Sequence, residues 1–72
     1  MTNSYWLSPV GEKDDFGQPI GDVIYDAKTR MGPWALMSQR SWVNYAFSPL
    51  LGTGYGQRYE KQEDGRWLKT AG

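Results

Sequence analysis

The sequence contains neither cysteine nor histidine. Without cysteine the chain forms no disulfide bond and offers no thiolate to a metal or a substrate. Without histidine it lacks the commonest metal ligand and the side chain that most often acts as general base near neutral pH. These two absences argue against most metal centres and against most nucleophilic catalysis.

A surplus of one charge and a long apolar run are missing as well. Eight Lys and Arg side chains balance eight Asp and Glu side chains, so net charge does not direct the chain to nucleic acid or to an anionic membrane. No stretch of about 18 apolar residues is present to span a bilayer. The first eight residues lack the basic and apolar regions of a secretory signal. We therefore expect a cytoplasmic protein that does not bind membranes.

Carboxylates are present, but their spacing defines no catalytic or metal site. Glu12, Asp14 and Asp15 lack the alternate ligands, the central Gly and the distal Glu of an EF-hand. Nothing in the spacing fixes these side chains, or Asp22 and Asp26, as a pair on opposite sides of a substrate. We expect a protein that is not an enzyme and that carries no cofactor.

The glycines at positions 52, 54 and 56 lack the context of a nucleotide site. Exposed backbone N–H groups in such a run can bind phosphate. However, no Gly-Lys-Ser/Thr sequence follows the glycines, and no βαβ unit surrounds them. The run predicts a tight turn at which two backbone segments approach closely.

Aromatic side chains are abundant. The 72 residues include four Trp, five Tyr and two Phe, and so short a chain must fill its core with few, large side chains. We expect one compact domain over residues 1–72, with residues 1–4 and 71–72 frayed. The predicted fold class is mainly β, with a small α+β fold as the alternative.

Strand-forming residues cluster in separate segments of the chain. Residues 31–37 are the most apolar segment and predict the central strand, and residues 20–25 predict an earlier strand. Residues 26–30 between them predict a polar turn. Near the N-terminus, residues 5–7 predict an edge strand or an anchored arm, and the polar residues 11–19 predict a loop.

One short helix is expected over residues 42–47. Trp42, Tyr45 and Ala46 share one side at three- and four-residue spacing, and Ser41 is suited to cap the N-terminus. A strand over the same residues is the alternative, because most of these side chains also favour strands.

The C-terminal third predicts a β-hairpin over residues 57–70. Asp64-Gly65 suits a two-residue type I′ turn. That loop length places Glu60 opposite Lys69, which is a favourable pair of opposite charges. A change of one residue in the loop length would place Glu60 opposite Leu68 instead.

Three segments resemble a family of small phage, prophage and mobile-element proteins that has no settled function. They are residues 26–37 (DAKTRMGPWALM), residues 51–59 (LGTGYGQRY) and residues 64–69 (DGRWLK). The resemblance covers roughly residues 16 to 70. Many family members carry two Cys-x-x-Cys pairs, which is the ligand spacing of a zinc ribbon.

The resemblance implies a zinc-ribbon-like domain that has lost its metal ligands. Ser38 and Ser41 occupy the positions of the later cysteine pair, and Lys13 and Phe16 occupy those of the earlier pair. These four side chains cannot replace four thiolates around zinc. We expect aromatic packing to supply the stability instead, with Phe16 filling the vacated centre. Stoichiometric zinc in the purified protein, or a melting temperature that depends on zinc, would contradict this expectation.

The expected function is that of a protein-interaction module in the host cytoplasm. The aromatic content exceeds what a small core encloses easily, and Trp, Tyr and Arg are typical interface anchors. The partner would be a host or phage protein, or a second copy of the chain. The candidate interaction residues are Trp42, Tyr45, Phe47, Tyr55, Arg58 and Trp67.

The alternative function is that of a single-stranded nucleic-acid-binding module. Arginines interleave with aromatic residues along the chain, as in proteins that stack bases on aromatic rings beside Arg. Zinc ribbons often contact nucleic acids, which supports this alternative by analogy only. The net charge of zero argues against it, because phosphate contacts dominate such affinity.

Overall fold

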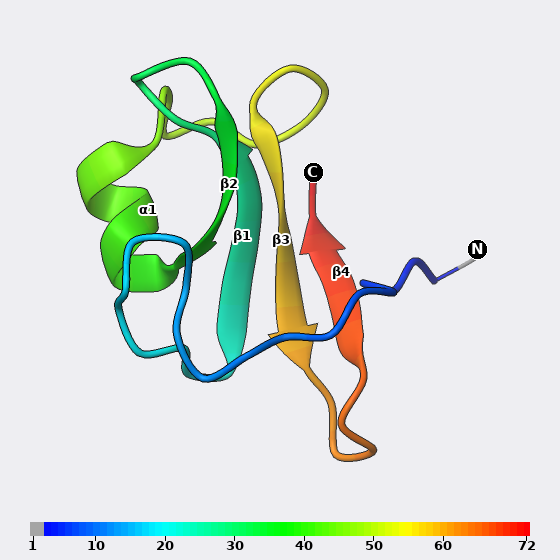
Figure 1. Ribbon diagram of the computed structural model, residues 1–72. Helices are drawn as coiled ribbons and strands as arrows, with labels where there is room; N and C mark the ends of the chain where they lie inside the picture. Colours follow the sequence, from blue (N-terminus) through cyan, green and yellow to red (C-terminus); the bar gives the residue numbers. More distant parts are fainter. Residues whose placement is uncertain (1–2) are drawn as a thin grey trace.

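The computed structural model describes residues 3–72 and contains a four-stranded antiparallel sheet with one short helix (Figure 1). The strand order is β2-β1-β3-β4. This architecture confirms the expected mainly β class, the single short helix and the C-terminal hairpin. The elements are β1 (Val23–Lys28), β2 (Trp34–Ser38), α1 (Gln39–Tyr45), β3 (Gly56–Lys61) and β4 (Trp67–Ala71).

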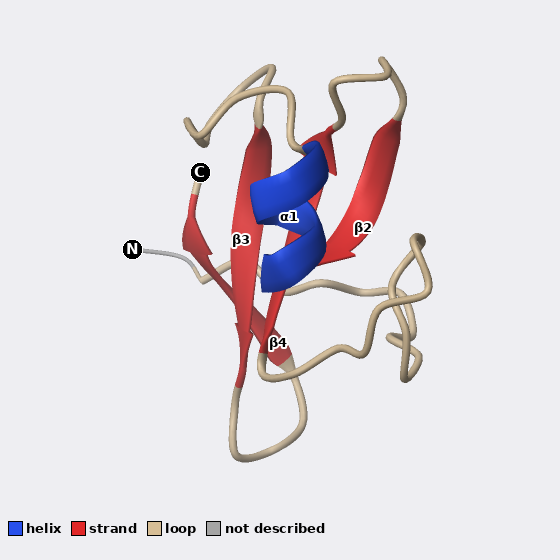
Figure 2. Ribbon diagram, turned by 90° about the vertical axis from the view of Figure 1, so that its left-hand side faces the viewer, coloured by secondary structure: helices blue, strands red, loops and turns tan. Residues whose placement is uncertain are grey.

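The two faces of the sheet have different covers. α1 packs against β1 and β2 on one face. In Figure 2 the helix lies in front of the sheet, and the N-terminal part of the chain passes behind it. On that far face the ring of Trp6 meets the ring of Tyr59 edge-on, with centroids 5.5 Å apart. The sheet is therefore the middle layer between a helix and an irregular N-terminal arm, which we define as residues 4–12.

The core on the helix side is built around Tyr25, Ala27 and Met37. Alternate residues of β1 point to this side, which explains why the polar Asp26 and Lys28 belong to a strand. The prediction that residues 26–30 form a turn was therefore wrong. β1 continues through Lys28, and the turn occupies residues 29–33, where the Thr29 N–H and hydroxyl both donate to the Pro33 carbonyl.

The strand expected to be central lies at an edge of the sheet. The apolar segment 31–37 contributes β2, which pairs only with β1, whereas β1 has a partner on each side. Trp34, at the start of β2, is 46% exposed. The prediction of a central strand over residues 31–37 was wrong, because hydrophobicity does not determine strand order. Part of the apolar segment is not in a strand either, since Met31 lies in the preceding turn with more than half of its surface exposed.

The helix begins three residues earlier than predicted. Ser38, not Ser41, is the N-cap, and its hydroxyl accepts a hydrogen bond from the Ser41 N–H at 3.3 Å. The helix ends at Tyr45, since Ala46 is extended and the Phe47 N–H donates to the Lys28 carbonyl. Pairing with the end of β1 therefore removes residues 46–47 from the predicted helix.

The hairpin forms with a three-residue loop rather than the predicted two-residue loop. Glu60 lies opposite Leu68, and the Gln62 N–H donates to the Arg66 carbonyl. No residue other than glycine has a positive φ among residues 3–72, so Asp64 does not take the first position of a type I′ turn. Its carboxylate instead accepts hydrogen bonds from the Arg66 N–H and Nε–H.

The glycine run forms the tight turn that the sequence predicts. The Gly52 N–H donates to the Gly56 carbonyl, and the Gly56 N–H donates to the Gly52 carbonyl. A Cβ at Gly56 would overlap the side chain and backbone of Ala27 in the neighbouring strand. Glycine is required here because two backbones approach closely.

Both edges of the sheet are covered by other parts of the chain. Along β4, the Lys69 N–H donates to the Ser4 carbonyl and the Trp6 N–H donates to the Trp67 carbonyl. Residues 5–7 are therefore an anchored arm that pairs with β4 at Tyr5. Along β2, Asp15 covers Leu36 through two hydrogen bonds of 2.7 and 3.0 Å. The expected fraying of residues 1–2 lies outside the described residues.

Candidate interaction surface

Two segments that are distant in sequence meet at the end of the sheet shown uppermost in Figure 1. Residues 28–30 run beside residues 45–47, with the Arg30 N–H donating to the Tyr45 carbonyl and the Phe47 N–H to the Lys28 carbonyl. The Lys28 N–H also donates to the carbonyl of Tyr55. We call residues 28–34 and 46–55 the loop end.

Large apolar side chains are exposed at and beside the loop end. Val43, within α1, is 70% exposed, and in the segment that follows α1 Phe47 is 53% and Leu50 59% exposed. Pro49 lies between the last two of these residues, and the Ser48 hydroxyl accepts a hydrogen bond from the Leu50 N–H. This local turn holds the apolar side chains outside the core.

A hollow of about 330 Å³ lies between α1 and the segment that follows it. Its floor includes Trp42, whose ring stacks on that of Tyr25 at 4.5 Å and 10°. The indole Nε1–H of Trp42 is buried and has no hydrogen-bond acceptor among residues 3–72. No charged side chain lines the hollow. Its lining residues are Trp42, Val43, Ala46, Phe47, Ser48 and Pro49.

Two cationic side chains lie over aromatic rings of the same surface. Lys28 Nζ lies 4.6 Å from the ring centroid of Phe47, and the guanidinium carbon of Arg30 lies 5.7 Å from that of Tyr45. The ring of Phe47 also stacks on Tyr55, with centroids 6.4 Å apart. Phe47 therefore belongs both to the hollow and to the cationic, aromatic border.

The structure brings together four of the six residues predicted to form the interaction site. Trp42, Tyr45, Phe47 and Tyr55 lie at or beside the loop end, but only Phe47 is more than half exposed. Tyr45 faces inward and stacks on Phe16 at 4.2 Å. Trp42 and Tyr45 therefore contribute mainly to packing.

The other two predicted residues, Arg58 and Trp67, lie elsewhere. Trp67 is 9% exposed and lies beneath the N-terminal arm. Arg58 projects from β3, where its guanidinium lies 3.8 Å from the Glu60 carboxylate and donates to the Thr70 hydroxyl. Neither residue contributes to the surface around the hollow.

Sequence reasoning missed Val43 and Leu50 as surface residues. The helical spacing that places Trp42, Tyr45 and Ala46 on the inner side places Val43 away from that side, so the pattern contained this signal. The exposure of Leu50 depends on the path of the loop after Pro49, and no periodicity encodes it.

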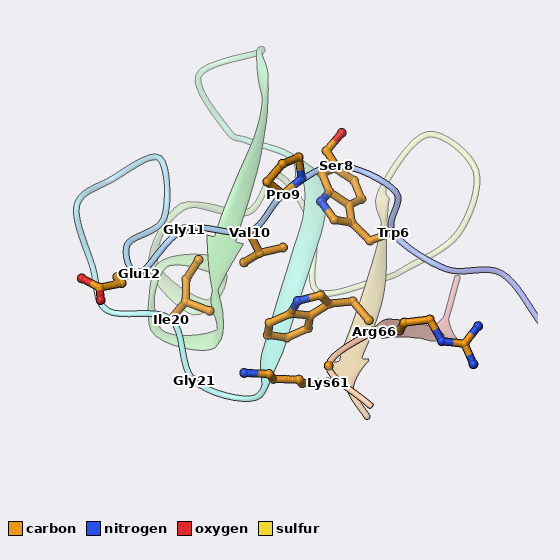
Figure 3. Close-up of a pocket in the computed structure, with 12 residues that line it drawn as sticks. Trp6, Ser8, Pro9, Val10, Gly11, Glu12, Ile20, Gly21, Lys61 and Arg66 are labelled. Carbon is orange, nitrogen blue, oxygen red and sulfur yellow. The ribbon is translucent and has the colours of Figure 1, made fainter. Parts of the chain in front are cut away.

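A second, larger hollow lies between the N-terminal arm and the C-terminal hairpin (Figure 3). Its volume is about 750 Å³. In Figure 3 the Glu12 and Arg66 side chains point away from it, and Lys61 lies along its margin. Arg66 is already held by the Asp64 carboxylate at 2.8 Å. No set of polar groups converges on its interior, so we assign no binding chemistry to it.

Three of the four positions predicted to be vacated metal-ligand positions, Phe16, Ser38 and Ser41, donate hydrogen bonds to the buried carboxylate of Asp14. Asp14 accepts hydrogen bonds from the backbone N–H groups of Phe16, Gln18 and Ser38 at 2.8–2.9 Å. Burial alone would raise the pKa of Asp14, but hydrogen bonds from the Ser41 hydroxyl, from the backbone N–H groups of Ser38 and Gln18 and from the Ser38 hydroxyl lower it to about 2. The carboxylate thus joins the loop at residues 12–19 to the start of α1.

The four positions differ in what they contact. Ser38 and Ser41 are buried and their hydroxyls lie 3.4 Å apart, whereas Lys13 is exposed and pairs with Pro19. Phe16 packs against the core and stacks on Tyr45. Residues 3–72 contain no group of three or more His, Cys, Asp or Glu side chains placed to hold a metal ion.

No helix in residues 3–72 is long and apolar enough to cross a membrane.

Comparisons with known proteins identify no relative. No protein-family model, curated protein or solved structure matches the chain.

Proposed function

We propose that this chain is a non-enzymatic protein-interaction module that binds a partner through the hollow beside α1. The observation that supports this proposal is the uncharged hollow lined by two apolar side chains that are more than half exposed, Val43 and Phe47, with a third exposed apolar side chain, Leu50, directly after the lining residue Pro49. Contiguous apolar surface of this kind marks interaction sites in soluble proteins. A phage or prophage setting for the partner rests on the sequence resemblance alone.

The energetics suit a small interface with a few strong contacts. Complete burial of an exposed aliphatic or aromatic side chain stabilises a complex by roughly 1.5–3 kcal/mol. Each of Val43, Phe47 and Leu50 retains more than half of its surface for such burial. A single apolar side chain of the partner that entered the hollow would contact at least two of them.

Surface substitutions test this proposal more cleanly than core substitutions do. Trp42→Ala and Trp67→Ala would remove side chains that pack in the fold, so a loss of binding would be ambiguous. Val43→Ser and Phe47→Ser change exposed side chains instead. Leu7→Ser is the matched control, because Leu7 is 94% exposed on the arm, away from the hollow.

The measurement is capture of partners from a bacterial host lysate by the immobilised protein. We expect the wild type and Leu7→Ser to capture the same proteins in equal amounts. The captured amount should fall at least about tenfold with Val43→Ser and with Phe47→Ser. Circular dichroism should be unchanged in all three variants, and all three should remain folded at the assay temperature in urea unfolding, with some loss of midpoint for Phe47→Ser because its ring stacks on Tyr55. Equal capture by Phe47→Ser and the wild type would contradict the proposed surface.

Single-stranded nucleic acid is the second candidate, and the observation in its favour is the pairing of Lys28 and Arg30 with aromatic rings. Two other arginines, Arg58 and Arg66, already have carboxylate partners. A labelled oligothymidylate tests the idea through its mobility at low and high salt. Absence of binding at low salt would remove it.

A further inference from the structure

The charges of this neutral chain are strongly segregated. All eight carboxylate side chains fall within residues 12–26 and 60–64, and residues 27–59 contain none. The central segment carries four cations, Lys28, Arg30, Arg40 and Arg58. A net charge of zero therefore conceals an acidic segment, residues 12–26, and a basic segment, residues 27–59, whereas the charges of residues 60–72 balance.

Folding keeps the loop end free of carboxylates and places three of the eight at the opposite end of the sheet. The loop end consists only of residues from the segment without carboxylates, and its charged side chains are Lys28 and Arg30. The hairpin loop at residues 63–65 and the turn that precedes β1 lie at the opposite end of the sheet (Figure 1). Carboxylates are present in both of these segments, at Asp22, Glu63 and Asp64.

The two cations of the loop end have no carboxylate partner. The side-chain ion pairs within residues 3–72 are Arg58–Glu60 and Arg66–Asp64. Lys28 and Arg30 instead lie over the rings of Phe47 and Tyr45, so the loop end keeps its positive charge. Lys28 lies over the ring of Phe47, which lines the hollow, and the backbone pairing of residues 28–30 with residues 45–47 holds Arg30 over the neighbouring ring of Tyr45.

We propose that the partner of this surface presents an acidic segment with an apolar side chain among its carboxylates. The apolar side chain enters the hollow between Val43 and Phe47, and the carboxylates lie against Lys28 and Arg30. This inference rests on the proposed function and specifies the chemistry of the partner. Charge complementarity at the rim of an apolar contact provides specificity and faster association.

The shape of the surface favours a protein segment over a lipid or a nucleic acid. A hollow of about 330 Å³ is of the size that receives one side chain or a short apolar motif. Anionic membranes are recognised by clusters of about four to eight basic residues, whereas this end has only Lys28 and Arg30. Nucleic-acid sites add a basic groove that follows the phosphates, and the lining of the hollow carries no charge.

The first experiment selects binders from a random displayed peptide library, with the full chain as bait. Peptides that bind the wild type but not Val43→Ser or Phe47→Ser should be rich in Asp and Glu and should contain Leu, Phe or Trp. If the selected peptides depend on Phe47 but are neutral or basic, the hollow is an interaction surface and the acidic partner is wrong. If no Phe47-dependent peptide is obtained, the proposed function and this inference both fail.

The second experiment measures affinity with a synthetic copy of the best peptide and with a copy in which Gln and Asn replace its acidic residues. We expect Lys28→Met with Arg30→Met to weaken the acidic peptide about tenfold, and the neutral copy to bind both proteins equally. The control Lys69→Met changes a cation on β4 and should stay within about twofold of the wild type. Equal binding of the acidic and neutral copies would overturn the inference.

Two further ligands test whether the loop end binds an anionic membrane or a nucleic acid instead of an acidic protein segment. Vesicles that contain phosphatidylglycerol, and oligothymidylate, are titrated under the same conditions. We expect neither to compete with the acidic peptide at physiological salt. Tighter binding of either ligand than of the peptide, with loss in the Lys28→Met and Arg30→Met variant, would assign the loop end to that class of partner instead.

Discussion

At the scale of single residues, Asp14 links two parts of the fold through its carboxylate. Its carboxylate receives three backbone N–H groups and joins a loop to a helix 24 positions away in sequence. Sequence reasoning identified the neighbourhood through Ser38 and Ser41 but treated Asp14 as part of a solvated loop. The carboxylate could not be recognised from the sequence, because its donors become neighbours only after folding.

We predict that Asp14→Asn destabilises the protein by about 1–2 kcal/mol at pH 7, allowing for partial screening by solvent. The pKa of Asp14 falls from 3.8 to about 2 on folding, so its contribution to stability is complete above pH 4 and is lost as the pH falls towards 2. Urea unfolding of the wild type and the variant at several pH values measures this effect, and the difference should shrink below pH 4.

Glu12→Gln, at an exposed site in the same loop, is the control. A difference that does not change between pH 7 and pH 2 would contradict the role of the charge.

Asp26 provides a prediction of the opposite sign. Burial in the sheet, followed by repulsion from Asp15, raises the pKa of Asp26 above its ordinary value. A raised carboxyl pKa means that the charged form destabilises the fold above that pKa. Asp26→Asn should therefore raise the unfolding free energy at pH 7 by about 0.5 kcal/mol, the scale of substitutions outside the tightly packed core. The gain should vanish at a pH where Asp26 is protonated in both states, and a loss of stability at pH 7 would show that the carboxylate makes a necessary contact.

At the scale of elements, the N-terminal arm allows a comparison of two adjacent residues. Trp6 packs edge-on against Tyr59, and its N–H pairs with the β4 backbone, whereas Leu7 is 94% exposed. We predict that Trp6→Ala lowers the unfolding free energy by about 2–3 kcal/mol and that Leu7→Ala changes it by less than about 0.5 kcal/mol. Chemical denaturation followed by far-ultraviolet circular dichroism measures both. Similar effects of the two substitutions would mean that the arm is not packed in solution.

The elements also show what sequence patterns can encode. Alternation of buried Tyr25 and Ala27 with polar Asp26 and Lys28 contains the signal for β1, but the cluster of polar residues suggested a turn. The loop of the hairpin was misjudged because Asp64-Gly65 is also compatible with a three-residue loop that has only Gly65 at positive φ. Local sequence thus specified the types of element. Tertiary hydrogen bonds determined their limits and register.

At the scale of the whole molecule, the mainly β class followed from the density of strand-forming residues, but the strand order did not. The most apolar segment became edge strand β2, because the loop that contains Asp14 and Asp15 shields its outer side. Of the predicted interaction residues, Phe47 and Tyr55 keep exposed rings at the loop end, and whether they bind a partner stays a prediction. The positive charge of the loop end could not be predicted from the net charge of the chain. It depends on which charged side chains folding brings to that end of the sheet.

The covered edges of the sheet lead to a prediction about assembly. Exposed strand edges promote association between chains, and here residues 4–6 cover β4 while Asp15 covers β2. We predict that the wild type is a monomer in sedimentation at high micromolar concentration, and that deletion of residues 1–6 produces dimers through β4. Trp6→Ala separates edge exposure from loss of stability, because it keeps the backbone pairing of the arm and should remain monomeric. A dimer of the wild type that is abolished by Phe47→Ser would instead place self-association at the loop end.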